Sequence, residues 1–207
     1  MTDTTVDPLP HRADRITMRV IGALVALMAV ALAAGQLSIA ANYAWAESLT
    51  LSLLADAPLP VTARHGVLAA STETVSVVTD ALTTGPRALF AGSAVLLAVT
   101  ALIVGLALAW LVFATAGGRP FRTALYRFSL GAGVALVLGP LLATALSGFA
   151  SMQAAVELND AVGGILLVGF GVSSWGFTIP VVGLGVVALA YLLRRMEALQ
   201  RDTELLV

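Results

Sequence analysis

The chain has 207 residues, of which 59% are hydrophobic and only 11% are charged, and its mean hydropathy is +0.96. A soluble domain carries about a quarter charged residues, so the composition favours a membrane protein over a soluble one. The absence of cysteine excludes disulfides and thiol chemistry, and a net charge of −1 gives no reason to expect direct contact with nucleic acid.

Long stretches without charge divide the chain. Four runs contain no Asp, Glu, Lys or Arg, at residues 20–46, 88–118, 128–156 and 161–193. About 20 apolar residues cross a bilayer as a helix, so each run can cross once and none can cross twice. The sequence therefore predicts an all-α integral membrane protein, with a cytoplasmic arm at 1–17, a four-helix membrane domain at 18–195 and an amphipathic cytoplasmic tail at 196–207.

The first span is expected near residues 18–43. The segment Ala44-Trp45-Ala46 resembles a signal-peptidase site, but the apolar run before it has 27 residues. Signal peptides have apolar regions of only about 7–15 residues. The first run is therefore predicted to remain as a membrane helix.

An outer segment at residues 47–87 separates the first two spans and is too long for a simple turn. Its β-branched residues predict a short hairpin, with strands near 59–63 and 74–78 and a turn at Arg64-His65-Gly66. Leu49, Leu51, Leu53 and Leu54 suggest that the first helix continues beyond the lipid. This cap is a candidate for contacts with a partner and equally a candidate for a purely structural lid.

The second span is expected near 88–114 and is followed by the sequence "GGRPFRTALYRF" at 117–128. Its glycines end one helix, and a proline is tolerated in the first turn of the next. The arginines suit a membrane surface on the cytoplasmic side. The turn motif comprises Gly118, Pro120 and Phe121, and the lipid-anchoring arginines are Arg119, Arg122 and Arg127.

The third span is expected near 126–150 and the fourth near 163–192. Gly131, Ala135, Gly139, Ala143 and Ser147 recur every four residues, which predicts a smooth packing stripe on the third span. Kinks are expected at Pro140 and Pro180 because proline removes a helical hydrogen-bond donor. A candidate pocket would be formed by Ser173, Ser174, Thr178 and Pro180 if the fourth helix were broken there, although a structural kink explains the same residues.

The tail continues the fourth span with the sequence "YLLRRMEALQRDTELLV". Arg194 and Arg195 stand at the end of the apolar run, where their side chains can reach lipid headgroups. The apolar positions beyond them have helical spacing. The tail is therefore predicted to be a stop-transfer anchor with an amphipathic end, or a docking helix for a soluble partner.

The arginines predict the orientation of the chain. Nine of them flank the predicted spans on the side of the two termini, and only Arg64 and Arg87 lie in the connections on the other side. Cytoplasmic loops of membrane proteins carry the excess of positive residues. Both termini are therefore expected in the cytoplasm of a bacterial plasma membrane.

Residues that carry chemistry are scarce. The two histidines, His11 and His65, are expected on opposite faces of the membrane and cannot share a metal ion. Motifs of zinc proteases, serine hydrolases and phosphate-binding loops are absent from the sequence. The spans hold none of the ionisable groups that mark pumps and transporters. The sequence therefore predicts no enzymatic activity, no cofactor and no metal.

Two stretches together resemble a bacterial family of four-span membrane proteins catalogued as domain of unknown function 2975. The first match is the turn at Gly118, Pro120, Phe121 and Arg127, in which Ala124 replaces a frequent asparagine. The second is the tail motif, for which Met196 stands where glycine is common and whose matching residues are Leu199, Gln200, Asp202, Glu204 and Val207. The resemblance implies four spans with a sizeable first loop and no known activity. Its members are often encoded beside small helix-turn-helix regulators, which implies a regulatory or stress-linked role.

Two functions remain open from the sequence. The first is a non-enzymatic membrane component that contacts a protein partner, either through the cytoplasmic loop and tail or through the outer cap. The second is a small-molecule or lipid-handling protein with a pocket near Pro180. Contact with the lipid bilayer is common to both, and homo-oligomerisation is compatible with both.

Overall fold

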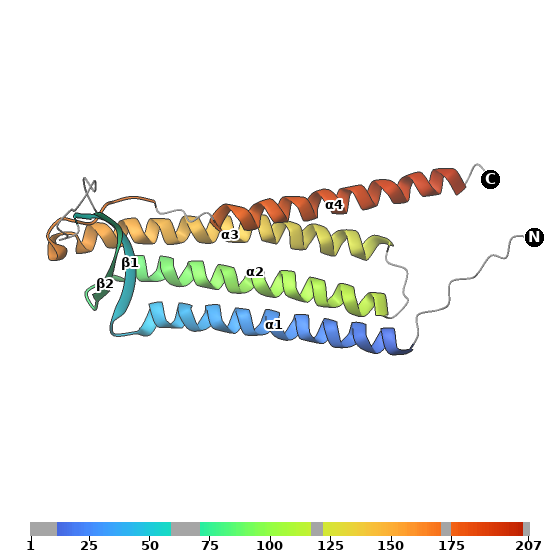
Figure 1. The fold of residues 1–207 in the computed structure, drawn as a ribbon, viewed down its shortest axis with the longest axis horizontal. Helices are drawn as coiled ribbons and strands as arrows, with labels where there is room; N and C mark the ends of the chain where they lie inside the picture. The colour runs from blue at the N-terminus through green and yellow to red at the C-terminus, as the bar shows by residue number, and fades with distance from the viewer. Residues whose placement is uncertain (1–11, 59–70, 117–121, 171–174, 205–207) are drawn as a thin grey trace, which may run out of the picture. The chain divides into compact units, whose positions relative to one another are not determined.

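The computed structural model describes residues 12–58, 71–116, 122–170 and 175–204, and helices form most of it (Figure 1). Its elements are, in chain order, α1 (Arg12–Trp45), β1 (Leu49–Pro58), β2 (Ser71–Thr79), α2 (Thr84–Ala116), α3 (Arg122–Leu158), the 3-10 turn η1 (Asp160–Val162) and α4 (Trp175–Glu204). Within these described residues, three helical stretches are long and apolar enough to cross a membrane: Ile16–Trp45, Thr84–Ala114 and Tyr126–Leu158. They contain the first three expected spans, and many of their large apolar side chains are exposed, as lipid contact requires.

The fourth expected span differs from the prediction in its start. The sequence predicts a helix from residue 163, but residues 163–170 are not helical and α4 begins at Trp175. Within the described side chains, its apolar part is the shorter stretch Thr178–Leu192. Pro180 consequently lies in the second turn of α4, whereas α3 continues as one helix through Pro140.

The chain divides into two compact units, and every helix contributes to both. The helical unit consists of residues 1–33, 99–137 and 181–207, and the cap unit consists of residues 34–98 and 138–180. The cap unit contains the hairpin of β1 and β2. Each unit is described separately below.

Small residues bring the helices of the helical unit close together. A side chain at Gly105 of α2 would meet the Cβ atom of Ala29 of α1, and one at Gly133 of α3 would lie 2.6 Å from a methyl group of Val187 of α4. Gly131 of α3, in contrast, is exposed and has nothing within 4 Å of the place where a Cβ would lie. Gly131 therefore makes no close helix contact, whereas Gly139 and Ala143 of the expected stripe are buried; in this unit the contact of α3 with α4 involves the face that carries Gly133.

Aromatic pairs also connect neighbouring helices of the helical unit. Trp110 of α2 stacks on Phe128 of α3 with 4.2 Å between ring centroids. Tyr126 of α3 and Tyr191 of α4 meet edge to face at 5.9 Å. Such pairs contribute about 0.5–1.5 kcal/mol beyond the area that they bury.

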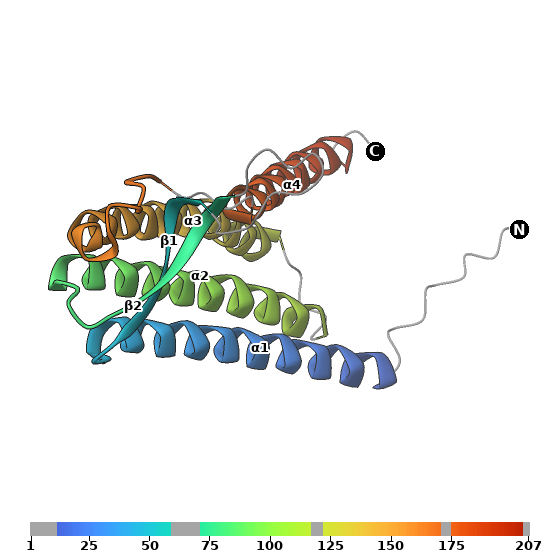
Figure 2. The same cartoon turned by 60° about the vertical axis from the view of Figure 1, so that its left-hand side comes forward.

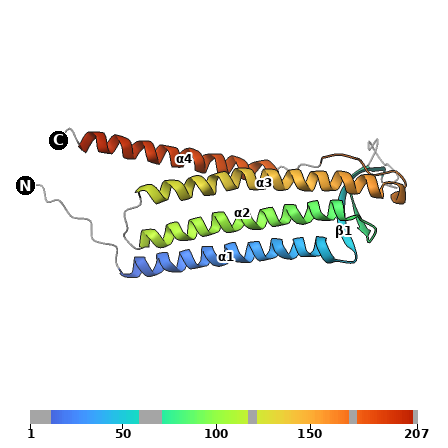
Figure 3. The ribbon, with the colours of Figure 1, turned by 180° about the vertical axis from the view of Figure 1, so that it is seen from behind.

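The cap unit contains an antiparallel hairpin that crosses the ends of its helices (Figure 2). The register pairs Leu49 with Thr79 and Leu53 with Val75, and an irregularity follows between Leu54 and Ala57. β1 starts four residues after the last residue of α1, so the chain turns from helix to strand at once (Figure 3).

The hairpin is present, as the sequence predicts, but one of its strands is elsewhere. The strand expected at 74–78 lies within β2 and is confirmed. The strand expected at 59–63 lies outside the described residues, and the partner of β2 is β1 at Leu49–Pro58. The interpretation of the leucines at 49–54 as a continuation of the first helix is therefore wrong.

Candidate functional site

The hairpin of β1 and β2 is attached to the helix ends of the cap unit through one face of its sheet. Leu49, Leu51 and Leu53 alternate along β1, and each is at most 3% exposed. They pack in a core with five residues from other segments of the cap unit, namely Leu82, Ala154, Ala155, Leu158 and Leu166. Burial of a leucine stabilises a fold by about 1.5–3 kcal/mol relative to an exposed one. The hairpin is thus held by its own hydrophobic core, although an isolated hairpin is only marginally stable in water.

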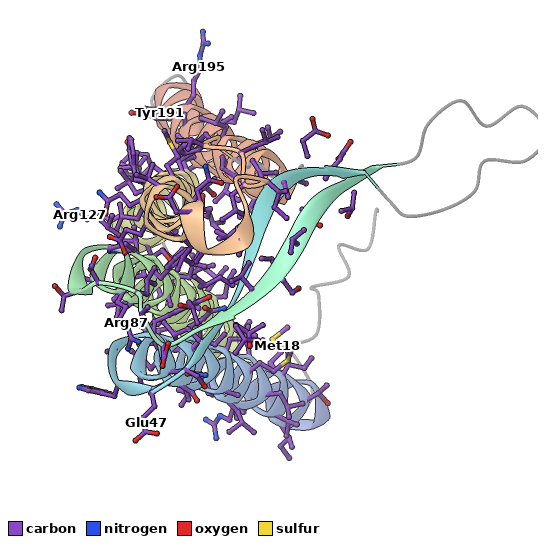
Figure 4. All side chains as sticks on the ribbon, turned by 90° about the vertical axis from the view of Figure 1, so that its left-hand side faces the viewer. Met18, Glu47, Arg87, Arg127, Tyr191 and Arg195 are labelled. Carbon is purple, nitrogen blue, oxygen red and sulfur yellow. The ribbon has the colours of Figure 1, made fainter. Side chains whose placement is uncertain are left out.

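Arg87 connects the end of α1 to the start of α2. Its Nη1 donates to the carbonyl oxygen of Ala46 at 2.8 Å, and its Nε donates to the carbonyl oxygen of Leu82 at 3.2 Å. The last carbonyls of a helix have no partner within the helix, and a cation is favourable beside them. Figure 4 shows Arg87 between the ends of these helices, whereas Glu47 points away from the protein.

Glu157, near the end of α3, binds the residue that precedes α2. One carboxylate oxygen accepts from the backbone N–H of Thr83 at 3.1 Å, and the other accepts from its hydroxyl at 2.5 Å. A carboxylate is favourable at the start of a helix, where N–H groups have no partner. This contact joins segments 74 residues apart in the sequence.

A tight turn after α3 returns the chain to the sheet. Gly163 and Gly164 have φ angles of 77° and 79°, which favour glycine. The side-chain oxygen of Asn159 accepts from the N–H of Leu166 at 3.0 Å. The turn thereby places residues 165–167, called the return segment below, beside β1, where Ala55 and Leu166 form an antiparallel bridge.

The other face of the hairpin is polar and exposed. Thr50, Ser52, Thr74 and Ser76 present hydroxyl groups on it, together with an exposed Val78. The cap unit also exposes six carboxylates, at Glu47, Asp56, Glu73, Asp80, Glu157 and Asp160. Among the cap residues that the structure describes, Arg87 is the only basic one, and its guanidinium is engaged as above. The cap is therefore a folded, acidic, hydroxyl-bearing surface.

The arginines and motifs singled out from the sequence lie elsewhere. Arg127 and Arg195 are exposed in the helical unit, and both point away from the helices (Figure 4). Arg122 belongs to α3, and Arg194, Leu199, Gln200, Asp202 and Glu204 belong to α4. Arg119, Gly118, Pro120, Phe121 and Val207 lie outside the described residues.

The candidate pocket lies only partly within the described residues. Ser173 and Ser174 lie outside the described residues, Thr178 is exposed and Pro180 is buried. The pocket is therefore not confirmed by the described residues and stays a prediction. Nor do the described residues contain a group of three or more His, Asp or Glu side chains that could hold a metal ion.

Sequence reasoning does not identify most of the residues that build the cap. The alternation of Leu49, Leu51 and Leu53 is the signal that could have located β1. Nothing in the local sequence connects Glu157 with Thr83 or Arg87 with Ala46. Comparisons with protein-family models, with curated proteins and with solved structures found no match.

Proposed function

We propose that the chain is a four-span, non-enzymatic membrane protein that holds its cap on the outer surface and binds a partner protein there. The observation that carries this proposal is the cap itself. It combines a hydrophobic core of its own with an exposed polar face. Side-chain hydrogen bonds also hold it to the helix ends, from Arg87 to Ala46 after α1 and from Thr83 to Glu157 near the end of α3. A mere connection between two spans needs only a few residues.

The length of α4 supports a fourth span. From Trp175 to the end of the charge-free run at Leu193 is about 28 Å of helix, at 1.5 Å per residue. The hydrocarbon core of a bilayer is about 30 Å thick. Arg194 and Arg195 follow directly and suit the headgroup region. The residues from 163 to 170 then belong to the cap and not to the span.

The charge distribution supports the orientation. The described cap residues expose six carboxylates, whereas nine of the eleven arginines lie near the opposite helix ends or in the terminal segments. By the positive-inside rule both termini are cytoplasmic and the cap is outside. The resemblance to a bacterial four-span family is compatible with this placement in a bacterial plasma membrane.

Site-specific photo-crosslinking in cells tests the binding function. A photoreactive amino acid is placed at Ser52 on the outer face of the hairpin, and at Gln200 in the tail. Leu32, an exposed apolar residue of α1, serves as the lipid-facing control. We expect a discrete protein adduct from Ser52 and none from Leu32. An adduct from Gln200 alone would assign partner binding to the cytoplasmic tail and contradict the proposal for the cap.

A further inference from the structure

The backbone hydrogen bonds between β1 and the return segment show in which direction the N–H and C=O groups of β1 point. The carbonyl oxygen of Leu54 accepts from the N–H of Leu167 at 2.9 Å, and the N–H of Asp56 donates to the carbonyl oxygen of Ile165 at 3.1 Å. The backbone groups of Leu54 therefore point away from β2. Leu54 is paired with Thr74, so this is a pair whose members do not bond each other.

The alternation of an antiparallel ladder then assigns the rest of β2. Pairs that exchange hydrogen bonds alternate with pairs that do not. Thr74 does not bond β1, so the backbone N–H and C=O groups of the next residue, Val75, point toward β1, as do those of Val77 and Thr79. The backbone N–H and C=O groups of Thr74, Ser76 and Val78 point outward, away from β1. The hydroxyl of Thr72 donates to the carbonyl oxygen of Thr74 at 3.0 Å, as expected for a carbonyl that β1 does not use.

The two edges of the hairpin differ in their protection. The return segment covers the edge of β1 at Leu54 and Asp56. Figure 4 shows β1 between that segment and β2. Within the described residues, no backbone group of β2 bonds to any segment other than β1. β2 has nine residues and contains neither proline nor lysine, which commonly protect strand edges.

The charge of the cap indicates the kind of strand that would fit. Glu73 lies in β2 and Asp80 follows its end, and both are exposed. The other four exposed carboxylates of the cap add to the same sign of charge. Complementary charge favours encounter and suppresses wrong partners, so a segment rich in Arg or Lys is favoured over an acidic one. The β2 strand of a second copy of this chain carries its own Glu73 and therefore lacks this complementarity.

We propose that the outer edge of β2 binds an extended, basic segment of the partner protein by strand addition. Thr74, Ser76 and Val78 supply the main-chain bonds, and Glu73 and Asp80 select the charge. In this mode main-chain bonds give affinity and alternate side chains give specificity. This inference rests on the proposed function in that it takes the cap as the partner-binding surface.

Peptide binding to the full chain in nanodiscs tests the inference. The probe is a fluorescent peptide about as long as β2, with alternating threonine and valine and an arginine at each end. Its matched control has glutamate at each end. Fluorescence anisotropy is measured with wild type, Ser76→Pro and Ser76→Ala. Ser76→Pro removes an outward N–H, which an edge strand tolerates, whereas Ser76→Ala removes only the hydroxyl.

We expect the arginine peptide to bind wild type and Ser76→Ala alike, and Ser76→Pro at least about fivefold more weakly, since one hydrogen bond is worth about that factor. The double variant Glu73→Gln, Asp80→Asn should bind the arginine peptide more weakly and the glutamate peptide no more weakly than wild type does. Unchanged thermal unfolding of Ser76→Pro shows that the fold is intact.

Two outcomes would overturn the inference. The first is equal affinity of wild type and Ser76→Pro, or no binding by wild type at all. The second is a loss of dimers on Ser76→Pro, measured by mass photometry, without peptide binding, which would assign the edge to a second copy. Neither outcome removes a crosslink from Ser52, so failure of the edge is distinguishable from failure of the cap as a binding surface.

Discussion

Arg87 holds two backbone carbonyls that belong to different connections of the cap. Its side chain is half-buried and bonds Ala46 and Leu82. Hydrogen bonds to a charged group are worth about 1.5–3 kcal/mol each before solvent exposure is considered. The structure thus explains the arginine by its hydrogen bonds to these two carbonyl oxygens, without any contact to a ligand.

Replacement of Arg87 by methionine should destabilise the cap. Methionine keeps the apolar stem but leaves the carbonyls of Ala46 and Leu82 without their donor, so we expect a loss of about 1–3 kcal/mol. Arg87→Lys should recover part of it, because an ammonium can reach one carbonyl. Thermal unfolding in nanodiscs checks both variants, and equal stability of wild type and Arg87→Met would contradict the role.

Glu157 and Thr83 should behave as a coupled pair. Glu157→Gln replaces one acceptor oxygen by an amide donor, and Thr83→Val removes the hydroxyl but keeps the N–H. We expect each change to cost about 0.5–1.5 kcal/mol, reduced because both residues are exposed. A double-mutant cycle on unfolding should show that the double variant costs less than the sum of the single ones. Strict additivity would mean that the contact carries no energy.

Two glycines of α3 offer a test of close helix packing at the scale of one residue. Alanine at either position gains about 1 kcal/mol of helix propensity. A methyl group at Gly131 has open space, whereas one at Gly133 would press on Val187 and on the backbone of α4. Gly131→Ala should therefore be neutral or stabilising, and Gly133→Ala should lower the unfolding temperature. A fall for Gly131→Ala instead would mean that Gly131 also packs closely against another helix.

At the scale of the element, the hairpin shows how a β-strand can directly follow a long apolar helix. The buried positions of β1 repeat every second residue, which fits a strand with one face on a core. The intervening residues Thr50 and Ser52 are exposed. This pattern predicts opposite responses of neighbouring residues to substitution.

Leu51→Ala should detach the hairpin, and Ser52→Ala should leave it in place. Truncation of a buried leucine costs about 2–5 kcal/mol, whereas a surface change away from special contacts stays within about 0.5 kcal/mol. Hydrogen exchange of the amides in β1 and β2 should be faster in Leu51→Ala alone. Equal protection in both variants would mean that the core does not hold the sheet.

The sequence was sufficient for some elements because their signals are local. Long charge-free runs predicted the first three spans, and β-branched residues predicted the strand at 74–78. The leucines at 49–54 were ambiguous, since a short apolar run beside a helix fits a continued helix as well as a buried strand. Tertiary contacts with α3 and with the return segment resolve this ambiguity, and no local signal reports them.

The same limit applies to the fourth helix and to the site. Residues 163–170 are apolar and free of charge, so composition alone merges them with the following helix. The paired glycines with positive φ and the bond from Leu166 to Asn159 place them in the cap instead. The sequence identifies the cap as a candidate for contacts. It does not identify Arg87 and Glu157, because these side chains form hydrogen bonds with backbone atoms or with residues far away in the sequence.

At the scale of the whole molecule, helices dominate the part of the chain that the structure describes. The described chain is mostly helical with three stretches able to cross a membrane and a small sheet. A fourth span and the orientation are proposals that rest on helix length and on the positions of the arginines. The resemblance to a bacterial family of unknown function stays a prediction, and so does a role of the cytoplasmic tail.

The cap can bind an extracytoplasmic partner only if it lies outside the cell, which places the N-terminus inside; the proposed fourth span places the C-terminus inside as well. Because the chain contains no cysteine, single cysteines can be introduced at Thr4, Ser76 and Thr203 and labelled in intact cells with a membrane-impermeant maleimide. We predict labelling at position 76 in intact cells, and labelling at 4 and 203 only after the membrane is permeabilised. Labelling of position 4 or 203 in intact cells, or protection of position 76, would contradict the four-span arrangement with an outer cap.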